Sequence, residues 1–192
     1  MSDREISAEI LESCRRGDRD AFRALYETYK DRVYSLALHF FHGDQAAAQD
    51  MTQQVFLKLM TGIARFEGRS GFSTWLYRLV SNACLDGARR ARSRPQPADP
   101  REIVALAAAP LQEAHLVQAQ TASSIQAAVA ALPPKLRLPI LLRYFDGRSY
   151  EEIAAALNCS MGTVASRLSR GHKLLAEKLA ALRAAPPAVE ER

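Results

Sequence analysis

Residues Ser149 to Leu175, reading SYEEIAAALNCSMGTVASRLSRGHKLL, have the pattern of two helices joined by a short turn. Ser149 and Glu152 have the spacing of a capping box, which starts a helix. Asn158 tolerates a left-handed backbone and ends that helix, and Ser160 can cap the next one. A helix pair with so short a turn restricts the possible folds of this part of the chain more than any other feature.

The second predicted helix has two faces of different character. At about 100° per residue, one face is apolar and can pack on the preceding helix. It consists of Val164, Leu168, Gly171, Leu175, Leu179 and Leu182. The other face offers hydroxyls and cations: Thr163, Ser166, Arg167, Arg170 and Lys173. These groups suit phosphates and guanine edges, so the pattern predicts a DNA-binding helix-turn-helix, although a solvated amphipathic helix remains the alternative.

The overall charge agrees with a polyanionic partner. The chain has a net charge of +5 and a sequence pI of about 9.3. A basic excess of this size favours nucleic acid but is shared by many unrelated proteins. The charged N-terminal stretch is unlike a signal peptide, and no apolar run is long enough for a bilayer, so we expect a cytoplasmic protein without membrane contact.

The cysteines and histidines predict neither a metal site nor a disulfide framework. Cys14, Cys84 and Cys159 are far apart, odd in number and form no CxxC pair. His39 and His42 have no Cys at ligand spacing, and we interpret them as helix-end residues. We therefore expect no cofactor, and a redox role for one cysteine stays open.

Helical periodicity dominates the chain, and no stretch sustains the alternation of a β-strand. Helices are predicted over 6–16, 21–41, 45–60 and 72–91, then again on both sides of Pro133-Pro134. Between them, residues 95–119 are rich in Pro and Ala, which is typical of a linker with room for one short helical piece. We expect an all-α fold of two small helical domains, 1–94 and 120–183, joined by a flexible linker at 95–119 and followed by a disordered tail at 184–192.

The helix predicted over 72–91 ends in a basic cluster. Arg89, Arg90, Arg92 and Arg94 lie within six residues. Cations stabilise a helix C-terminus, but four arginines are more than that purpose needs. A phosphate-binding surface is the better interpretation. Trp75 falls on the apolar stripe of the same helix and is predicted to be a core residue rather than a base-stacking one.

Three stretches in this order resemble the bacterial sigma factors of the ECF (extracytoplasmic-function) group. They are QDMTQQVFLKLM at 49–60, FEGRSGFSTWLYRLVSNACLDGARRARSR at 66–94, and LPPKLRLPILLRYFDGRSYEEIAAALNCSMGTVASRLSRGHKLL at 132–175. The resemblance implies a transcription initiation factor whose partners are core RNA polymerase, through its β′ and β subunits, and promoter DNA. An anti-sigma factor is a further partner that the resemblance suggests.

The resemblance assigns roles to matching positions. It implies contact with core polymerase by Asp50, Gln53, Gln54 and Phe56. It implies contact with the −10 element by Phe66, Arg78, Asn82, Arg89, Arg90 and Arg92. It implies contact with the −35 element by Arg148, Thr163, Ser166, Arg167, Arg170 and Lys173. Gln49 and Gln54 depart from the family, which often has Glu there, so the polymerase contact is expected to rely less on ion pairs.

Two other functions are compatible with parts of the sequence. The first is a stand-alone helix-turn-helix regulator whose N-terminal domain senses a ligand or dimerises. The Gly-rich loop at 66–71, Trp75 and the arginine cluster disfavour it, because a sensor has no need of them. The second is a helical enzyme, and the sequence has no nucleophile–base set, paired carboxylates or ligand cluster to support it. We therefore expect that the protein is not an enzyme.

Overall fold

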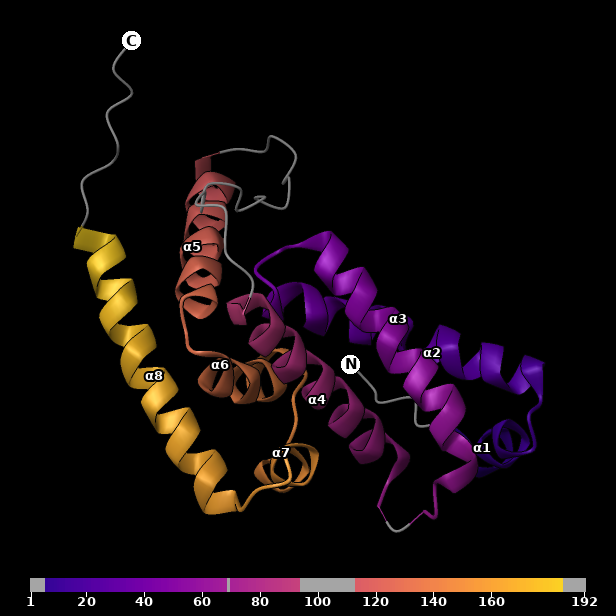
Figure 1. Ribbon diagram of the computed structural model, residues 1–192. Helices are drawn as coiled ribbons and strands as arrows, with labels where there is room; N and C mark the ends of the chain where they lie inside the picture. Colours follow the sequence, from indigo (N-terminus) through magenta and orange to yellow (C-terminus); the bar gives the residue numbers. More distant parts are fainter. Residues whose placement is uncertain (1–5, 69, 94–112, 185–192) are drawn as a thin grey trace.

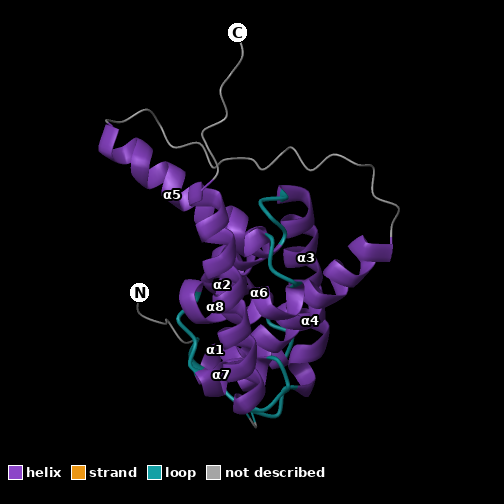
Figure 2. Cartoon of the chain, turned by 90° about the vertical axis from the view of Figure 1, so that its left-hand side faces the viewer, coloured by secondary structure: helices purple, strands orange, loops and turns teal. Residues whose placement is uncertain are grey.

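The computed structural model describes residues 6–68, 70–93 and 113–184, and within these ranges the chain folds into helices without strands (Figures 1 and 2). The elements are α1 (Ala8–Arg15), α2 (Arg19–Phe40), α3 (Gln45–Gly62), the 3-10 turn η1 (Ile63–Arg65), α4 (Phe72–Ser93), α5 (Glu113–Ala130), α6 (Pro134–Ile140), the π-helical turn η2 (Leu141–Phe145), α7 (Tyr150–Ala156) and α8 (Met161–Ala184). The expectation of an all-α fold is confirmed.

Short polar side chains begin the first three helices. Ser7 Oγ accepts a hydrogen bond from Ile10 N at 3.3 Å, and Asp44 Oδ1 accepts one from Ala47 N at 2.9 Å. Asp18 caps α2 in the same way, two residues before the Asp20 expected from the sequence. These caps satisfy amide groups that have no partner inside the helix.

The N-terminal half is a bundle of α1 to α4. Helix α2 packs against α1 and α3, and α3 packs against α4. Tyr29, Leu36, Val55 and Leu76 lie at its centre, each at most 1% exposed. Trp75 packs on the edge of this core with Phe66 and Phe72, as the apolar stripe predicted.

The C-terminal half is built around α8, which contacts α5, α6 and α7. Pro139 lies within α6, and the α-helix ends one residue later and continues as the π turn η2. Proline supplies no amide hydrogen and its ring crowds the carbonyl of the preceding turn, which disturbs regular α-helical geometry at this point. The interruption turns the chain toward α7 and places Asp146 and Arg148 between the two halves.

The two halves pack against each other. Helix α4 contacts α6 and α7, α2 contacts α5, α6 and η2, and one cluster of buried residues extends through both halves. In Figure 1, α6 and α7 lie beside α4, while α8 runs along the outer flank. Periodicity along the chain cannot reveal such packing, because each helix shows only that it has an apolar side.

One buried arginine joins the ends of helices from both halves. Arg137 Nη1 donates to Phe40 O at the end of α2, and Nη2 donates to Ala130 O and Leu132 O at the end of α5, each at 2.6 Å. Helix C-termini carry partial negative charge, which a guanidinium stabilises. Burial lowers the pKa of the adjacent His42, and the charge of Arg137 lowers it further, to about 4.

The linker expectation needs one correction. Helix α5 begins at Glu113, so residues 113–119 are helical rather than part of a linker. Alanine and glutamine are good helix formers, and the Ala-rich composition that suggested a tether is equally compatible with a helix. The rest of the expected linker, 95–112, and the expected tail from 185 onward lie outside the described residues.

No helix in the described ranges combines the length and apolar character that a bilayer span requires.

Replacement of Arg137 tests its role as a joint. We expect Arg137→Met to lower the free energy of unfolding by about 2–4 kcal/mol, since hydrogen bonds to a charged group contribute roughly 1.5–3 kcal/mol and their loss leaves buried carbonyls without this donor. The matched control is Lys135→Met, an exposed cation on the same helix, which should change stability by no more than about 0.5 kcal/mol. Urea denaturation measures both, and equal values for the two variants would contradict the role.

Candidate nucleic-acid interface

The helix-turn-helix unit of α7 and α8 is held by local hydrogen bonds. Ser149 Oγ accepts from Glu152 N at 3.2 Å, while Glu152 Oε2 accepts from Ser149 N at 2.7 Å, which completes the predicted capping box. Asn158 has a φ of 48°, in the left-handed region where asparagine is tolerated. Ser160 Oγ accepts from Thr163 N at 3.1 Å at the start of α8. The turn therefore has a defined geometry.

Helix α8 buries its apolar face and presents a basic one. Val164 and Leu168 are fully buried against the rest of the C-terminal half. Ser166, Arg170 and Lys173 are exposed, and Thr163 and Arg167 are partly exposed. Within the described residues none of these cations has a carboxylate at ion-pairing distance, so their charge is available to an anionic partner. The geometry brings all five predicted residues of α8 onto one accessible face.

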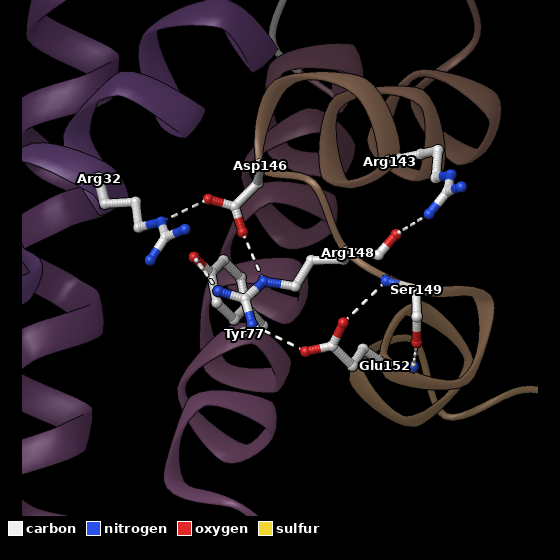
Figure 3. Close-up of polar contacts among 7 residues, drawn as sticks. All are labelled: Arg32, Tyr77, Arg143, Asp146, Arg148, Ser149 and Glu152. Atoms are coloured by element: carbon white, nitrogen blue, oxygen red, sulfur yellow. Dashed lines mark hydrogen bonds and ion pairs between the residues drawn. The ribbon is translucent and has the colours of Figure 1, made fainter. Parts of the chain in front are cut away.

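Arg148, which the family resemblance assigns to the −35 element, lies away from this face. Its side chain is 6% exposed, and its guanidinium lies 4.4 Å from the centre of the Tyr77 ring on α4. Nε donates to Asp146 Oδ2 at 2.7 Å and Nη1 to Glu152 Oε1 at 2.8 Å (Figure 3). The expectation of a surface position is corrected: packing against α4 covers a group that the sequence shows only as polar.

On α4, the predicted residues separate into exposed and engaged groups. Asn82, Arg90 and Arg92 are exposed, and Arg89 is exposed but paired with Asp86 one turn away. Arg78 is partly buried, because its Nε and Nη2 donate to Ala155 O of α7 at 3.3 and 3.2 Å. The exposed members form a polar and basic surface along the second half of α4.

Phe66 lies in the loop between η1 and α4. Its ring is half-buried, 5.2 Å from the centre of the Trp75 ring and 5.9 Å from that of Phe72. Aromatic neighbours restrict the orientation of this half-buried ring.

Helix α3 exposes only some of the residues that were predicted to contact a partner. Asp50 and Gln53 are exposed, and Gln54 accepts a hydrogen bond from Arg90 Nη2 through Oε1 at 3.1 Å. Phe56, predicted to contact a partner, is instead 6% exposed and packs edge-on against Tyr26 with 4.7 Å between ring centres. It is a core residue, because it lies on the side of α3 that faces α2.

Two apolar residues of α3 were missed by the sequence analysis. Leu57 is 59% exposed and Met60 is 53% exposed. They follow Asp50 and Gln53 at intervals of three and four residues, so the four share one face of the helix. The sequence contains a sign of their exposure, because Leu57 and Met60 fall outside the apolar stripe formed by Met51, Val55 and Leu59.

The described residues contain no cluster of three or more metal-ligating side chains. The thiols of Cys14 and Cys84 are buried, and burial raises the pKa of both. Deprotonated thiolate is the reactive form, so these two cysteines are poorly suited to redox chemistry or metal binding.

Comparison with known families divides the chain into two matching parts. Residues 25–94 match the model of Sigma-70 region 2, and residues 122–175 match that of Sigma-70 region 4. The first part contains the α3 and α4 surfaces described above, and the second contains the helix-turn-helix.

Similar proteins match over nearly their whole length. The RNA polymerase sigma-H factor of Pseudomonas aeruginosa is 31% identical over 187 residues, which cover 93% of this chain and 96% of that protein. The ECF RNA polymerase sigma factor SigW of Bacillus subtilis is 31% identical over 179 residues, covering 88% and 94%. The ECF RNA polymerase sigma-E factor of Escherichia coli (strain K12) is 31% identical over 188 residues, covering 93% and 97%.

Solved structures share the fold. CnrH, in its complex with the cytosolic domain of CnrY, superposes with a TM-score of 0.65 at 20% identity, covering 90% of this chain and 96% of that one. The sigma factor RpoE from Bartonella quintana, in complex with the anti-sigma factor NepR, gives 0.60 at 23% identity, covering 83% and 96%.

The different burial of two adjacent α3 residues gives a direct test. Phe56→Ala should lower the free energy of unfolding by about 3–5 kcal/mol, the usual cost of truncating a buried aromatic ring. Leu57→Ala, the exposed neighbour, should change it by less than about 0.5 kcal/mol. Thermal and urea denaturation measure both, and an equal loss in the two variants would contradict the orientation of α3.

Proposed function

Because the chain belongs to the ECF sigma factors of RNA polymerase, we propose that three of its surfaces divide the work of promoter recognition. As a member of that family it is a transcription factor: it binds core polymerase and directs initiation at specific promoters. The proposal concerns which residues do so. It rests above all on the exposed basic face of α8 on a capped helix-turn-helix.

The α8 face is proposed to read the −35 element. Arg167 and Arg170 can donate to guanine edges in the major groove, and Ser166 and Thr163 can contact bases or phosphates. Lys173 lies one turn beyond Arg170 and suits a phosphate. Exposure of this face in the folded chain supports the assignment, because no rearrangement within the C-terminal half is needed.

The α4 surface with the Phe66 loop is proposed to hold the −10 element. An amide such as that of Asn82 can pair with the Watson–Crick edge of an unstacked base, and the Phe66 ring can stack on it. Arg89, Arg90 and Arg92 are proposed to contact the backbone of the opened strand. Arg78 belongs to this group only when its bond to α7 is broken.

The face of α3 is proposed to contact core polymerase, with a revised membership. Asp50, Gln53 and Gln54 stay in the proposal, Phe56 leaves it, and Leu57 and Met60 enter it. An exposed apolar pair beside polar groups is typical of a protein–protein contact with an apolar centre and a polar rim. Such a contact relies on burial of apolar area, which compensates for the Gln residues at positions where the family often has Glu.

The alternative of a stand-alone regulator with a sensor domain loses its support. Its N-terminal half would have to be unrelated to polymerase binding, whereas residues 25–94 match Sigma-70 region 2. The anti-sigma partner and the path of the linker along the polymerase stay predictions from the family resemblance.

Core binding is tested on α3. Leu57→Ala combined with Met60→Ala should weaken the affinity for purified core polymerase at least about tenfold, as expected when interface anchors are truncated. The control is Thr61→Ala, an exposed residue next to Met60. Fluorescence anisotropy of labelled protein measures the affinity, and unchanged binding by the double variant would remove these residues from the surface.

Promoter reading is tested on the two DNA surfaces separately. With the reconstituted holoenzyme and a promoter library, Arg167→Ala should reduce selection at −35 positions, because a bidentate contact discriminates by about 1–3 kcal/mol. Asn82→Ala should reduce selection at −10 positions and leave −35 preference unchanged. If neither variant alters the preferred sequences, the assignment of these residues is wrong.

A further inference from the structure

Gln54 on α3 and Arg90 on α4 connect two surfaces to which the proposed function gives different partners. Arg90 Nη2 donates a hydrogen bond to Gln54 Oε1 at 3.1 Å. The two residues are far apart in the sequence and meet because α3 packs along α4 (Figure 1). Gln54 is half-buried, whereas Arg90 is exposed. The contact therefore lies at the edge of the helix pair, where Gln54 is held by its surroundings and Arg90 reaches solvent.

The contact with Gln54 leaves the charge of Arg90 uncompensated. An amide is neutral, and within the part of the chain that the structure describes, Arg90 has no carboxylate at ion-pairing distance. Its neighbour Arg89 differs, because Asp86, one turn earlier on the same helix, forms an ion pair with it. Of these two adjacent arginines, Arg90 keeps the stronger attraction for an anion.

The hydrogen bond also restricts the Arg90 guanidinium. A long arginine side chain loses rotamer freedom when it binds a partner, and this loss lowers the affinity. The contact with Gln54 removes part of that freedom before any DNA is bound. A guanidinium has five N–H donors, so the bond to Gln54 leaves other donors for a phosphate.

We propose that Gln54 is a positioning residue for DNA capture: it orients Arg90 toward the backbone of the opened −10 strand and leaves the positive charge of Arg90 available to a phosphate. The inference rests on the proposed function, which assigns Arg90 to that backbone. It adds that a residue of α3, the helix proposed to contact polymerase, raises the affinity for DNA without touching the DNA.

The presence of Gln where the family often has Glu then has a physical consequence. A carboxylate at position 54 would form an ion pair with Arg90, and a phosphate would have to compete with it. An amide accepts the same hydrogen bond without that competition. The NH2 group of Gln54 can also donate to an acceptor on core polymerase, which an ionised carboxylate cannot do. Its two proposed roles are therefore compatible.

The salt dependence of DNA binding tests the proposal. The probe is a fluorescent single-stranded oligonucleotide with the −10 sequence selected from the promoter library, bound to purified holoenzyme. Each phosphate contact on single-stranded DNA contributes about 0.7 to the slope of log K against log salt concentration. Gln54→Glu should make the slope shallower by about 0.7 and weaken binding about fivefold at roughly 0.1 M salt, because the ion pair withdraws Arg90 from the DNA.

The matched control for the added charge is Gln49→Glu. Gln49 is an exposed residue of the same helix, five positions before Gln54. The substitution adds the same charge without the contact to Arg90, so screening by salt should keep the change in slope below about 0.2.

A second variant, Gln54→Ala, separates the orientation of Arg90 from its charge. It removes the hydrogen bond and leaves Arg90 charged. The slope should therefore stay the same, while binding weakens about two- to threefold because more rotamer freedom is lost on binding. Unchanged affinity of Gln54→Ala would overturn the orientation of Arg90 by Gln54.

Arg90→Gln distinguishes the two possible failures. It should make the slope shallower by about 0.7, and Gln54→Glu should have no further effect on the slope in this background. If Arg90→Gln changes the slope but Gln54→Glu behaves like Gln49→Glu, the positioning role is overturned and the assignment of Arg90 to DNA stands. If Arg90→Gln leaves the slope unchanged, the proposed contact of Arg90 with the −10 strand fails, and the positioning role fails with it. Circular dichroism and the affinity for core polymerase confirm that each variant is folded and assembled.

Discussion

A buried carboxylate, Asp146, fixes the loop before α7 against the N-terminal half, because it accepts hydrogen bonds from Arg32 of α2 and from Arg148. Both of its oxygens are used, and its side chain is almost fully buried. A buried carboxylate is costly unless it is paired and hydrogen-bonded, so the group stabilises only the geometry in which both arginines are present. This requirement restricts where the loop before α7 can lie relative to α2.

The same physical property, a delocalised cation with several donors, serves opposite purposes in different arginines. Arg137 is buried and joins the ends of α2 and α5, whereas Arg170 on α8 is exposed and available to an anion. Arg78 and Arg148 lie between these extremes, since each makes contacts at the boundary between the two halves. Whether an arginine stabilises the fold or binds a partner is therefore decided by what packs over it, not by its type.

The helices and their ends could be predicted to a large extent from the sequence. Ser149 and Glu152 form the capping box that their spacing indicated, Asn158 adopts the left-handed backbone, and α4 begins at Phe72 as expected. These features depend on residues a few positions apart, whose interactions are set by local backbone geometry. The family resemblance likewise rested on contiguous motifs, which is why it was visible without a structure.

Tertiary structure alone decided which residues face a partner and which face the other half. Phe56 and Leu57 are adjacent and both apolar, yet one is buried and the other exposed, because only one side of α3 meets α2. Arg148 and Arg170 are both cations in the helix-turn-helix region, yet only the first is covered by α4. Local sequence determines that a helix has an apolar side and where it ends; the partner of that side is set by contacts between residues as far apart as Arg32 and Asp146, which no local pattern encodes.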